Sequence, residues 1–421
     1  MQTQRSRRFY RQARSLFPGG VSSPVRAFAP YPRFLHRGRG AYVYDVDGNR
    51  YIDWCMAFGP LILGHAHPYV VEQIRRQLGA GWNFGAPTEA EIRLGEKVRG
   101  HFPSVEMLRF VNSGTEATMH AIRLARGATG RRKIVKATGA YHGAHDAVLV
   151  RAGSGATTFG VPSSAGVLGD TAKHTLTVPF NDADAMRKVV TASRRDLAAV
   201  ILEPMLGNAG PIPPEDGYLQ EVREVTEAND VLLIFDEVIT GFRLAMGGAQ
   251  ERYGVRADLT TLGKILGGGV PIGAFGGPAE LMEYLAPLGN VYQAGTASGN
   301  PLAMTAGLAT LDVLKRTGLR GVNRLGDRMR KGLADAAAEF GFRAQGLASM
   351  FQLFLTAKPV RSYEDALACD AKAFHRLFLA LLDEGVYLPP SQFETCFLST
   401  AHTGKDVDAT LEAFAKCLAD V

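Results

Sequence analysis

The sequence predicts an α/β protein, with a mostly parallel sheet in a large domain and a smaller α+β domain beside it. Residues 197–204 and 231–238 are short, β-branched and nearly unbroken apolar runs, typical of strands that are buried on both faces of a parallel sheet. Residues 217–230 lie between them and space their apolar side chains as a helix does. The order strand, helix, strand is the signature of a βαβ unit.

Further elements are expected on both sides of this unit. A turn followed by a helix from about Gly114 to Gly127 comes first, and then a strand at 133–137. After about residue 311 the pattern changes to long amphipathic helices around one strand, at 322–340, 370–385 and 350–356. We therefore expect three parts, which are an N-terminal segment that packs with the small domain (1–60), a large domain (61–310) and a C-terminal small domain (311–421).

Composition and charge exclude several classes of protein. The chain has 421 residues and 46% hydrophobic content, enough for a large core. Its 47 basic and 41 acidic residues give a net charge of +6, but the basic residues are dispersed, so no nucleic-acid-binding arm is expected. The four cysteines lie far apart without a CxxC pair, and no window approaches about eighteen uncharged apolar residues. We expect a cytoplasmic protein with no disulfide framework, no structural zinc and no membrane contact.

Asp236 is the first candidate for chemistry, because it follows the apolar core of a predicted strand at its carboxyl end. Ligands of open parallel sheets usually bind at that end. Strand alternation puts Asp236 and Val238 on one face. A carboxylate there can pair with a protonated ring nitrogen while the valine packs against the flat ring. The alternative is an aspartate that caps the next element.

Lys264 is the one positively charged residue in the segment 258–277, and small and apolar residues flank it. Such surroundings disfavour an ammonium and lower its pKa, as a Schiff-base amine requires. The alternative is an ordinary surface lysine. The glycine run 267–269 favours the first interpretation, because it implies that the backbone closely approaches another group.

Two more motifs precede Asp236 in the chain. Ser113, Gly114 and Thr115 begin a predicted helix, whose free N–H groups and dipole suit a phosphate. The alternative is a plain N-cap. Tyr141 can stack on a planar ring. The pair His142 and His145 lacks the partners that a metal site needs, so no metal is expected.

In this order, the motifs resemble the class III, fold-type I aminotransferases, which use pyridoxal 5′-phosphate or pyridoxamine 5′-phosphate and have a seven-stranded sheet. Within that class, the chain looks like the glutamate-1-semialdehyde 2,1-aminomutases from about residue 8 to 420. The Ser-Pro-Val-Arg stretch 23–26 and the Ser-Gln-Phe-Glu stretch 391–394 carry this likeness, since generic class III enzymes usually lack both. Phe58, where a Trp is usual, and a shorter stretch at 27–34 look like the archaeal branch.

The resemblance implies a role for each matching residue. Lys264 would form the Schiff base, Asp236 would contact the pyridine nitrogen and Tyr141 would stack on the ring, and these three are the expected catalytic residues. The other implied cofactor contacts are Ser113, Gly114, Thr115, His142, Glu203, Asn208, Val238 and Thr296, with Thr296 reaching the phosphate of the other subunit of a homodimer. The implied substrate residues are Ser23, Arg26, Glu394 and Ser163, the last on a lid at 153–168.

The implied reaction converts (S)-glutamate 1-semialdehyde to 5-aminolevulinate, for tetrapyrrole (porphyrin) biosynthesis, by way of 4,5-diaminovalerate. A glutamyl-tRNA reductase that hands over the semialdehyde is a further partner that the resemblance suggests. Two other interpretations stay open. One is a class III ω- or β-amino-acid aminotransferase that needs a second amino acid, and the other is a catalytically silent scaffold with the same fold.

Overall fold

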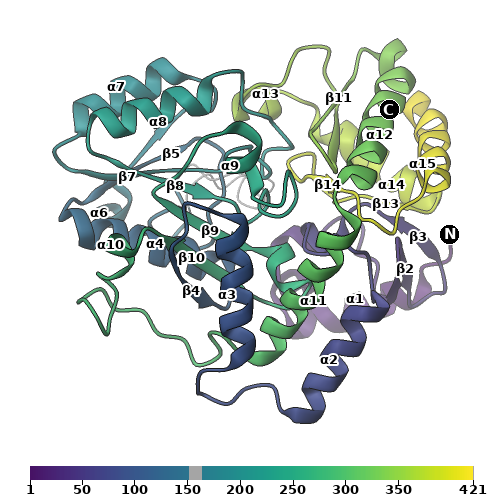
Figure 1. Cartoon of the computed structure of the whole chain (residues 1–421). Helices are drawn as coiled ribbons and strands as arrows, with labels where there is room; N and C mark the ends of the chain where they lie inside the picture. The colour runs from purple at the N-terminus through teal and green to yellow at the C-terminus, as the bar shows by residue number, and fades with distance from the viewer. Residues whose placement is uncertain (151–163, 421) are drawn as a thin grey trace.

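A seven-stranded sheet forms the centre of the molecule in the computed structural model, which describes residues 1–150 and 164–420 (Figure 1). Strand β10 is antiparallel to both of its neighbours, and the remaining pairs of neighbours are parallel. The predicted mostly parallel sheet is therefore confirmed. Its spatial order is β4 (Met107–Val111), β10 (Gly273–Gly277), β9 (Leu259–Gly263), β8 (Leu232–Asp236), β7 (Leu197–Leu202), β5 (Lys133–Ala137) and β6 (Thr175–Val178).

The central strands are buried on both faces, as their apolar runs predict, and every residue of β7 is buried. Helix α4 (Gly114–Thr129) packs on one face, whereas α7 (Ala183–Ser193) and α8 (Tyr218–Ala228) cover the other (Figure 1). Helix α8 is the predicted crossover between β7 and β8. Helix α4 runs two residues beyond its expected end and stops at Gly130, which adopts a left-handed conformation.

Shorter helices and a helical layer at the front complete this part of the chain (Figure 1). Helix α11 packs against both α2 and α3. It also runs through residues 310–311, where we expect the large domain to end and the C-terminal small domain to begin. Because one helix continues across this point, the boundary between the two domains stays a prediction. The bounds are α2 (Pro68–Ala80), α3 (Glu89–His101), α6 (Gly169–Ala172), α9 (Gly248–Tyr253), α10 (Ala279–Met282) and α11 (Pro301–Thr317).

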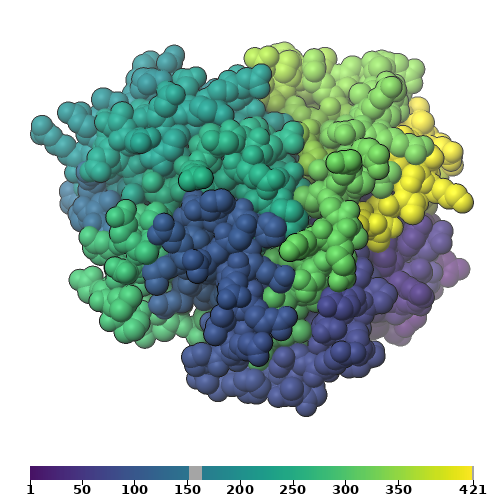
Figure 2. Space-filling view, in the orientation of Figure 1, coloured from purple at the N-terminus to yellow at the C-terminus, as the bar shows by residue number. Residues whose placement is uncertain are grey.

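The two ends of the chain lie together (Figures 1 and 2). Strand β13 of the C-terminal part pairs in parallel with β3 of the N-terminal part. The N-terminal elements are α1 (Gln4–Leu16), β1 (Leu35–Arg39), β2 (Tyr42–Asp45) and β3 (Arg50–Asp53). The C-terminal elements are α12 (Arg320–Ala337), β11 (Arg343–Gln345), β12 (Met350–Phe354), α13 (Tyr363–Leu367), α14 (Ala371–Asp383), β13 (Val386–Tyr387), β14 (Cys396–Phe397) and α15 (Gly404–Cys417).

No helix within the described residues is both long enough and apolar enough to cross a lipid bilayer.

Candidate active site

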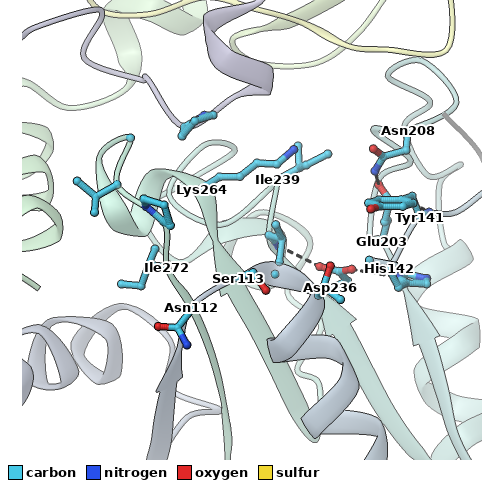
Figure 3. Close-up of a pocket in the computed structure, with 18 residues that line it drawn as sticks. Asn112, Ser113, Tyr141, His142, Glu203, Asn208, Asp236, Ile239, Lys264 and Ile272 are labelled. Carbon is cyan, nitrogen blue, oxygen red and sulfur yellow. Dashed lines mark hydrogen bonds and ion pairs between the residues drawn. The ribbon is translucent and has the colours of Figure 1, made fainter. Parts of the chain in front are cut away.

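The carboxyl ends of five strands meet at one edge of the central sheet. Strands β4, β9, β8, β7 and β5 all point to this edge, and β10 begins there because it runs the opposite way. Five of the predicted site residues lie at or just after these strand ends and line a cavity of about 350 Å³ (Figure 3). They are Ser113 after β4, Lys264 after β9, Asp236 in β8, Glu203 after β7 and Tyr141 after β5.

Helix α4 begins at the cavity wall. Ser113 is its N-cap in an extended conformation, and its Oγ accepts a hydrogen bond of 3.1 Å from the Glu116 N–H. The first N–H groups of a helix have no acceptor within the helix. Gly114 and Thr115 carry them at the cavity surface. Ser113 therefore caps the helix, and together with Gly114 and Thr115 it also forms a site where an anion can be bound.

Gly143 is packed against this helix start. Its φ is +94°, and a Cβ at this position would lie 2.6 Å from the Thr115 Cα. The loop that carries Tyr141 and His142 can therefore approach α4 this closely only with glycine at position 143.

Gly143→Ala should lower stability more than Gly48→Ala. Gly48 has the same φ of +94°, but a Cβ added there would meet no atom within 4 Å, so only the conformational cost applies. We expect about 1–2 kcal/mol of destabilisation for Gly48→Ala and about 1–3 kcal/mol more for Gly143→Ala, from the contact with Thr115. Thermal melting of the two variants would measure the difference, and equal losses would contradict the close packing.

Asp236 lies at the bottom of the cavity with only 5% of its surface exposed. Its Oδ2 is 2.7 Å from the His142 Nδ1, and its Oδ1 accepts from the Thr261 hydroxyl and the Val238 N–H, each at 3.2 Å. These contacts hold the carboxylate in one orientation. The other ring nitrogen of His142, Nε2, is buried without a partner among the described residues.

Glu203 holds the side of the cavity that Tyr141 and Asn208 line. Its Oε1 accepts from the Tyr141 N–H at 2.8 Å, and its Oε2 accepts from the Gly207 N–H and the Asn208 side chain, each at 2.9 Å. Burial raises the pKa of this carboxyl, while these N–H donors oppose the change. Glu203 thereby fixes Tyr141 and Asn208 at the cavity.

Lys264 extends over the strand ends, above Asp236 and Ser113 (Figure 3). Its φ of +46° is unfavourable for a residue with a Cβ, and such strain is found mostly at functional sites. Burial lowers the pKa of its amine, although the carboxylates of Glu394, Glu203 and Asp236 raise it. A neutral amine is therefore favoured more than in water.

Several predicted residues are not part of this cavity wall. Thr296 is exposed and lines a separate cavity with residues 83–87 and 298–301. Ser23 and Arg26, in a short helical turn, are not among the lining residues either. Glu394 is buried and acts electrostatically on both Lys264 and Tyr141. Ser163 and most of the expected lid lie outside the described residues.

Sequence reasoning missed part of the wall. Asn112 and Ile239 are direct sequence neighbours of the predicted site residues Ser113 and Val238, so proximity could have indicated them. The stretch 269–272 lines the cavity because β10 begins at this edge, which required the direction of that strand. Within the described residues, no group of three or more His, Cys, Asp and Glu side chains could hold a metal ion.

Comparison with known proteins places this site in a family context. A model of the class-III aminotransferases matches residues 25–418. A glutamate-1-semialdehyde 2,1-aminomutase from the archaeon Methanothrix thermoacetophila is 55% identical, over 97% of this chain and 95% of the relative. This relative bears out the expected resemblance to the archaeal branch.

Solved structures agree on the fold. An omega-transaminase from Sphaerobacter thermophilus has a TM-score of 0.92 and 37% identity, covering 99% of this chain and 97% of its own. A glutamate-1-semialdehyde aminomutase variant from Pseudomonas aeruginosa in complex with PMP has a TM-score of 0.88 and 27% identity. The match covers 99% of this chain and 94% of that structure's chain. The backbone therefore does not distinguish the two activities, whereas sequence identity separates the archaeal relative from the transaminase.

Proposed function

The chain belongs to the class-III aminotransferase family, and on that premise we propose that it converts (S)-glutamate 1-semialdehyde to 5-aminolevulinate. The observation that carries this is the 55% identity, over nearly the whole of both chains, to a relative with that name. Identity to the omega-transaminase is 37%. The Ser-Pro-Val-Arg and Ser-Gln-Phe-Glu stretches, at 23–26 and 391–394, favour the same activity.

The residues at the cavity fit pyridoxal 5′-phosphate or its pyridoxamine form. The start of α4 offers N–H groups for a phosphate, and Asp236 offers a fixed carboxylate for a protonated ring nitrogen. Val238 and Tyr141 border the space between them, where a flat ring can pack. When bound, the cofactor supplies an electron sink that stabilises carbanions.

Each residue at the cavity has its own role in the proposed reaction. Lys264 holds the cofactor and carries protons between the two reacting carbons of the substrate, since burial favours its neutral amine. Asp236 keeps the ring nitrogen protonated, and His142 orients Asp236. Glu203 positions Asn208 and the Tyr141 backbone. Ser23, Arg26, Ser163 and Glu394 are proposed to bind the substrate.

A homodimer completes this proposal, with Thr296 contributed to the phosphate site of the other subunit. Support comes from exposed apolar side chains near the Thr296 cavity, with Trp82 60% and Phe84 55% exposed, since exposed apolar patches mark interaction surfaces. A cytoplasmic location is proposed because all four cysteines are free thiols. Direct transfer from a glutamyl-tRNA reductase stays a prediction.

A single-substrate assay tests the proposal. The purified protein with its cofactor should form 5-aminolevulinate from glutamate 1-semialdehyde alone, because an amino group that moves within one molecule needs no external donor. The main competing function is an ω- or β-amino-acid aminotransferase, which the similarity to the omega-transaminase favours. Turnover only after a second amino acid is added would support that function and reject the aminomutase.

A further inference from the structure

Arg243 is a fully buried cation next to the cavity. It follows β8 by seven residues, and none of its surface is exposed. In the part of the chain that the structure describes, it has no carboxylate partner, and burial lowers the pKa of its guanidinium to about 9. Its charge is instead met by three oxygen acceptors and an aromatic ring. A buried, unpaired charge is costly, so its presence calls for a function.

The acceptors of Arg243 belong to parts of the chain outside the central sheet. One guanidinium nitrogen donates to the Gly59 carbonyl at 2.6 Å. A second guanidinium nitrogen donates to the Ser349 hydroxyl at 2.9 Å and to the Leu398 carbonyl at 3.3 Å. Arg243 therefore connects the sheet, the N-terminal segment and the C-terminal part at one point.

Gly59, the acceptor in the N-terminal segment, ends an unusual turn. Met56, Ala57 and Phe58 are three successive residues with left-handed φ values of +46°, +56° and +65°. Each conformation is unfavourable for a residue with a Cβ, so the surroundings must hold the turn in place. Asp53 holds its start by accepting from the Cys55 and Met56 N–H groups at 2.9 and 3.0 Å, and Arg243 holds its end at Gly59.

This turn packs directly on Lys264. A Cβ built on Gly59 would lie 3.2 Å from the Phe397 ring and 3.5 Å from the Lys264 Cδ. The Arg243 guanidinium lies 4.7 Å from the centre of the Phe397 ring, and the Lys264 Nζ lies 5.9 Å from the same centre. Phe397 and Gly59 are therefore shared between the buried arginine and the cavity lysine.

We propose that Arg243 is a positioning residue for Lys264. It clamps the 56–59 turn and Phe397 against the lysine side chain, and its positive charge disfavours a second positive charge on the Lys264 amine. The reaction that Lys264 serves rests on the proposed function. The clamp itself concerns only residues of this chain.

The charged groups around Lys264 show how the charge of Arg243 changes the pKa of the Lys264 amine. Burial is the largest influence on the pKa of the Lys264 amine and lowers it. The carboxylates of Glu394, Glu203 and Asp236 raise this pKa, whereas Arg243 lowers it. Removing the charge of Arg243 should therefore raise the pKa of Lys264 and leave more of the amine protonated near neutral pH.

Three full-length variants separate position from charge. Arg243→Lys keeps a charge but loses the fork that reaches three acceptors. Arg243→Gln loses the charge as well. Arg330→Gln is the control, because Arg330 also donates to two carbonyls at the start of β12, those of Ala348 and Met350, although it is paired with Asp327 as well. It touches neither Gly59 nor Phe397 through any hydrogen bond or ring contact in the described residues.

Two measurements are needed for each variant. The first is the pH dependence of acetic anhydride labelling of Lys264, read by mass spectrometry on the cofactor-free chain. The second is the pH profile of kcat for glutamate 1-semialdehyde in the loaded enzyme. Because labelling needs no turnover, it tests the effect of the Arg243 charge on Lys264 even if the proposed reaction is wrong.

We expect Arg243→Gln to move the labelling profile to higher pH by roughly half a unit to one unit. Arg243→Lys should keep the wild-type profile but lose about tenfold or more in kcat, because Lys264 is less well positioned. Arg330→Gln should change neither. A folded Arg243→Gln protein with the wild-type profile and kcat would overturn the proposal. If that variant does not fold, wild-type kcat in Arg243→Lys would overturn it.

Discussion

Lys264→Ala is expected to abolish turnover, with a loss in kcat on the order of 10²–10⁴-fold or more. In the proposed reaction, the Lys264 amine both holds the cofactor and carries the protons. Alanine leaves no amine at this place, because the charged groups that act on Lys264 are carboxylates and the Arg243 guanidinium, and none of them can form the covalent link. The loss should appear in kcat rather than in KM, since proton transfer occurs only in the transition state.

Lys264→Arg is the informative companion. Arginine keeps the positive charge and much of the length of lysine, but its guanidinium stays protonated in proteins. It therefore cannot accept a proton or form the covalent link, and its kcat should fall as far as that of the alanine variant. More than about one hundredth of wild-type kcat in either variant would mean that another group carries the protons. Stopped assays with glutamate 1-semialdehyde would measure both.

Part of the sheet and its ligand-binding edge could be predicted because their signals are local. Buried strands are apolar runs, and a polar residue just after such a run marks the edge where ligands bind. Asp236 was predicted by this rule, and Glu203 and Lys264 also come directly after strands, although Glu203 was assigned only by resemblance. The N-terminus of α4 was also predictable, since Ser113 is a typical N-cap residue.

Other features depend on contacts that no local pattern contains. The left-handed turn at 56–58 has no glycine or asparagine to indicate it, because distant residues, Asp53 and Arg243, hold it. Arg243 itself lies in a stretch that the family resemblance covers, but its burial depends on segments more than a hundred residues away. Thr296 and Arg26 could be matched only by resemblance, since a single chain does not bring them to the cavity.

Asp236→Asn is the second change for which we expect a large effect. Asparagine has the same shape, so it can still accept from the Thr261 hydroxyl and the Val238 N–H. It has no negative charge and cannot stabilise a proton on the ring nitrogen of the cofactor. We expect kcat to fall on the order of 10²–10³-fold, as when one fixed electrostatic contact to a reacting group is lost.

Thr261→Val provides the control for this change. It removes one hydrogen bond to Asp236 but keeps the carboxylate charge, so the loss should be about 0.5–1.5 kcal/mol, or roughly tenfold at most. Steady-state kinetics and a fluorescence titration with pyridoxal 5′-phosphate would separate slower turnover from weaker binding. If the two variants lose equal activity, the hydrogen bonds around Asp236 matter and its charge does not. A much larger loss in Asp236→Asn, with cofactor still bound, would instead assign the effect to the charge facing the ring nitrogen.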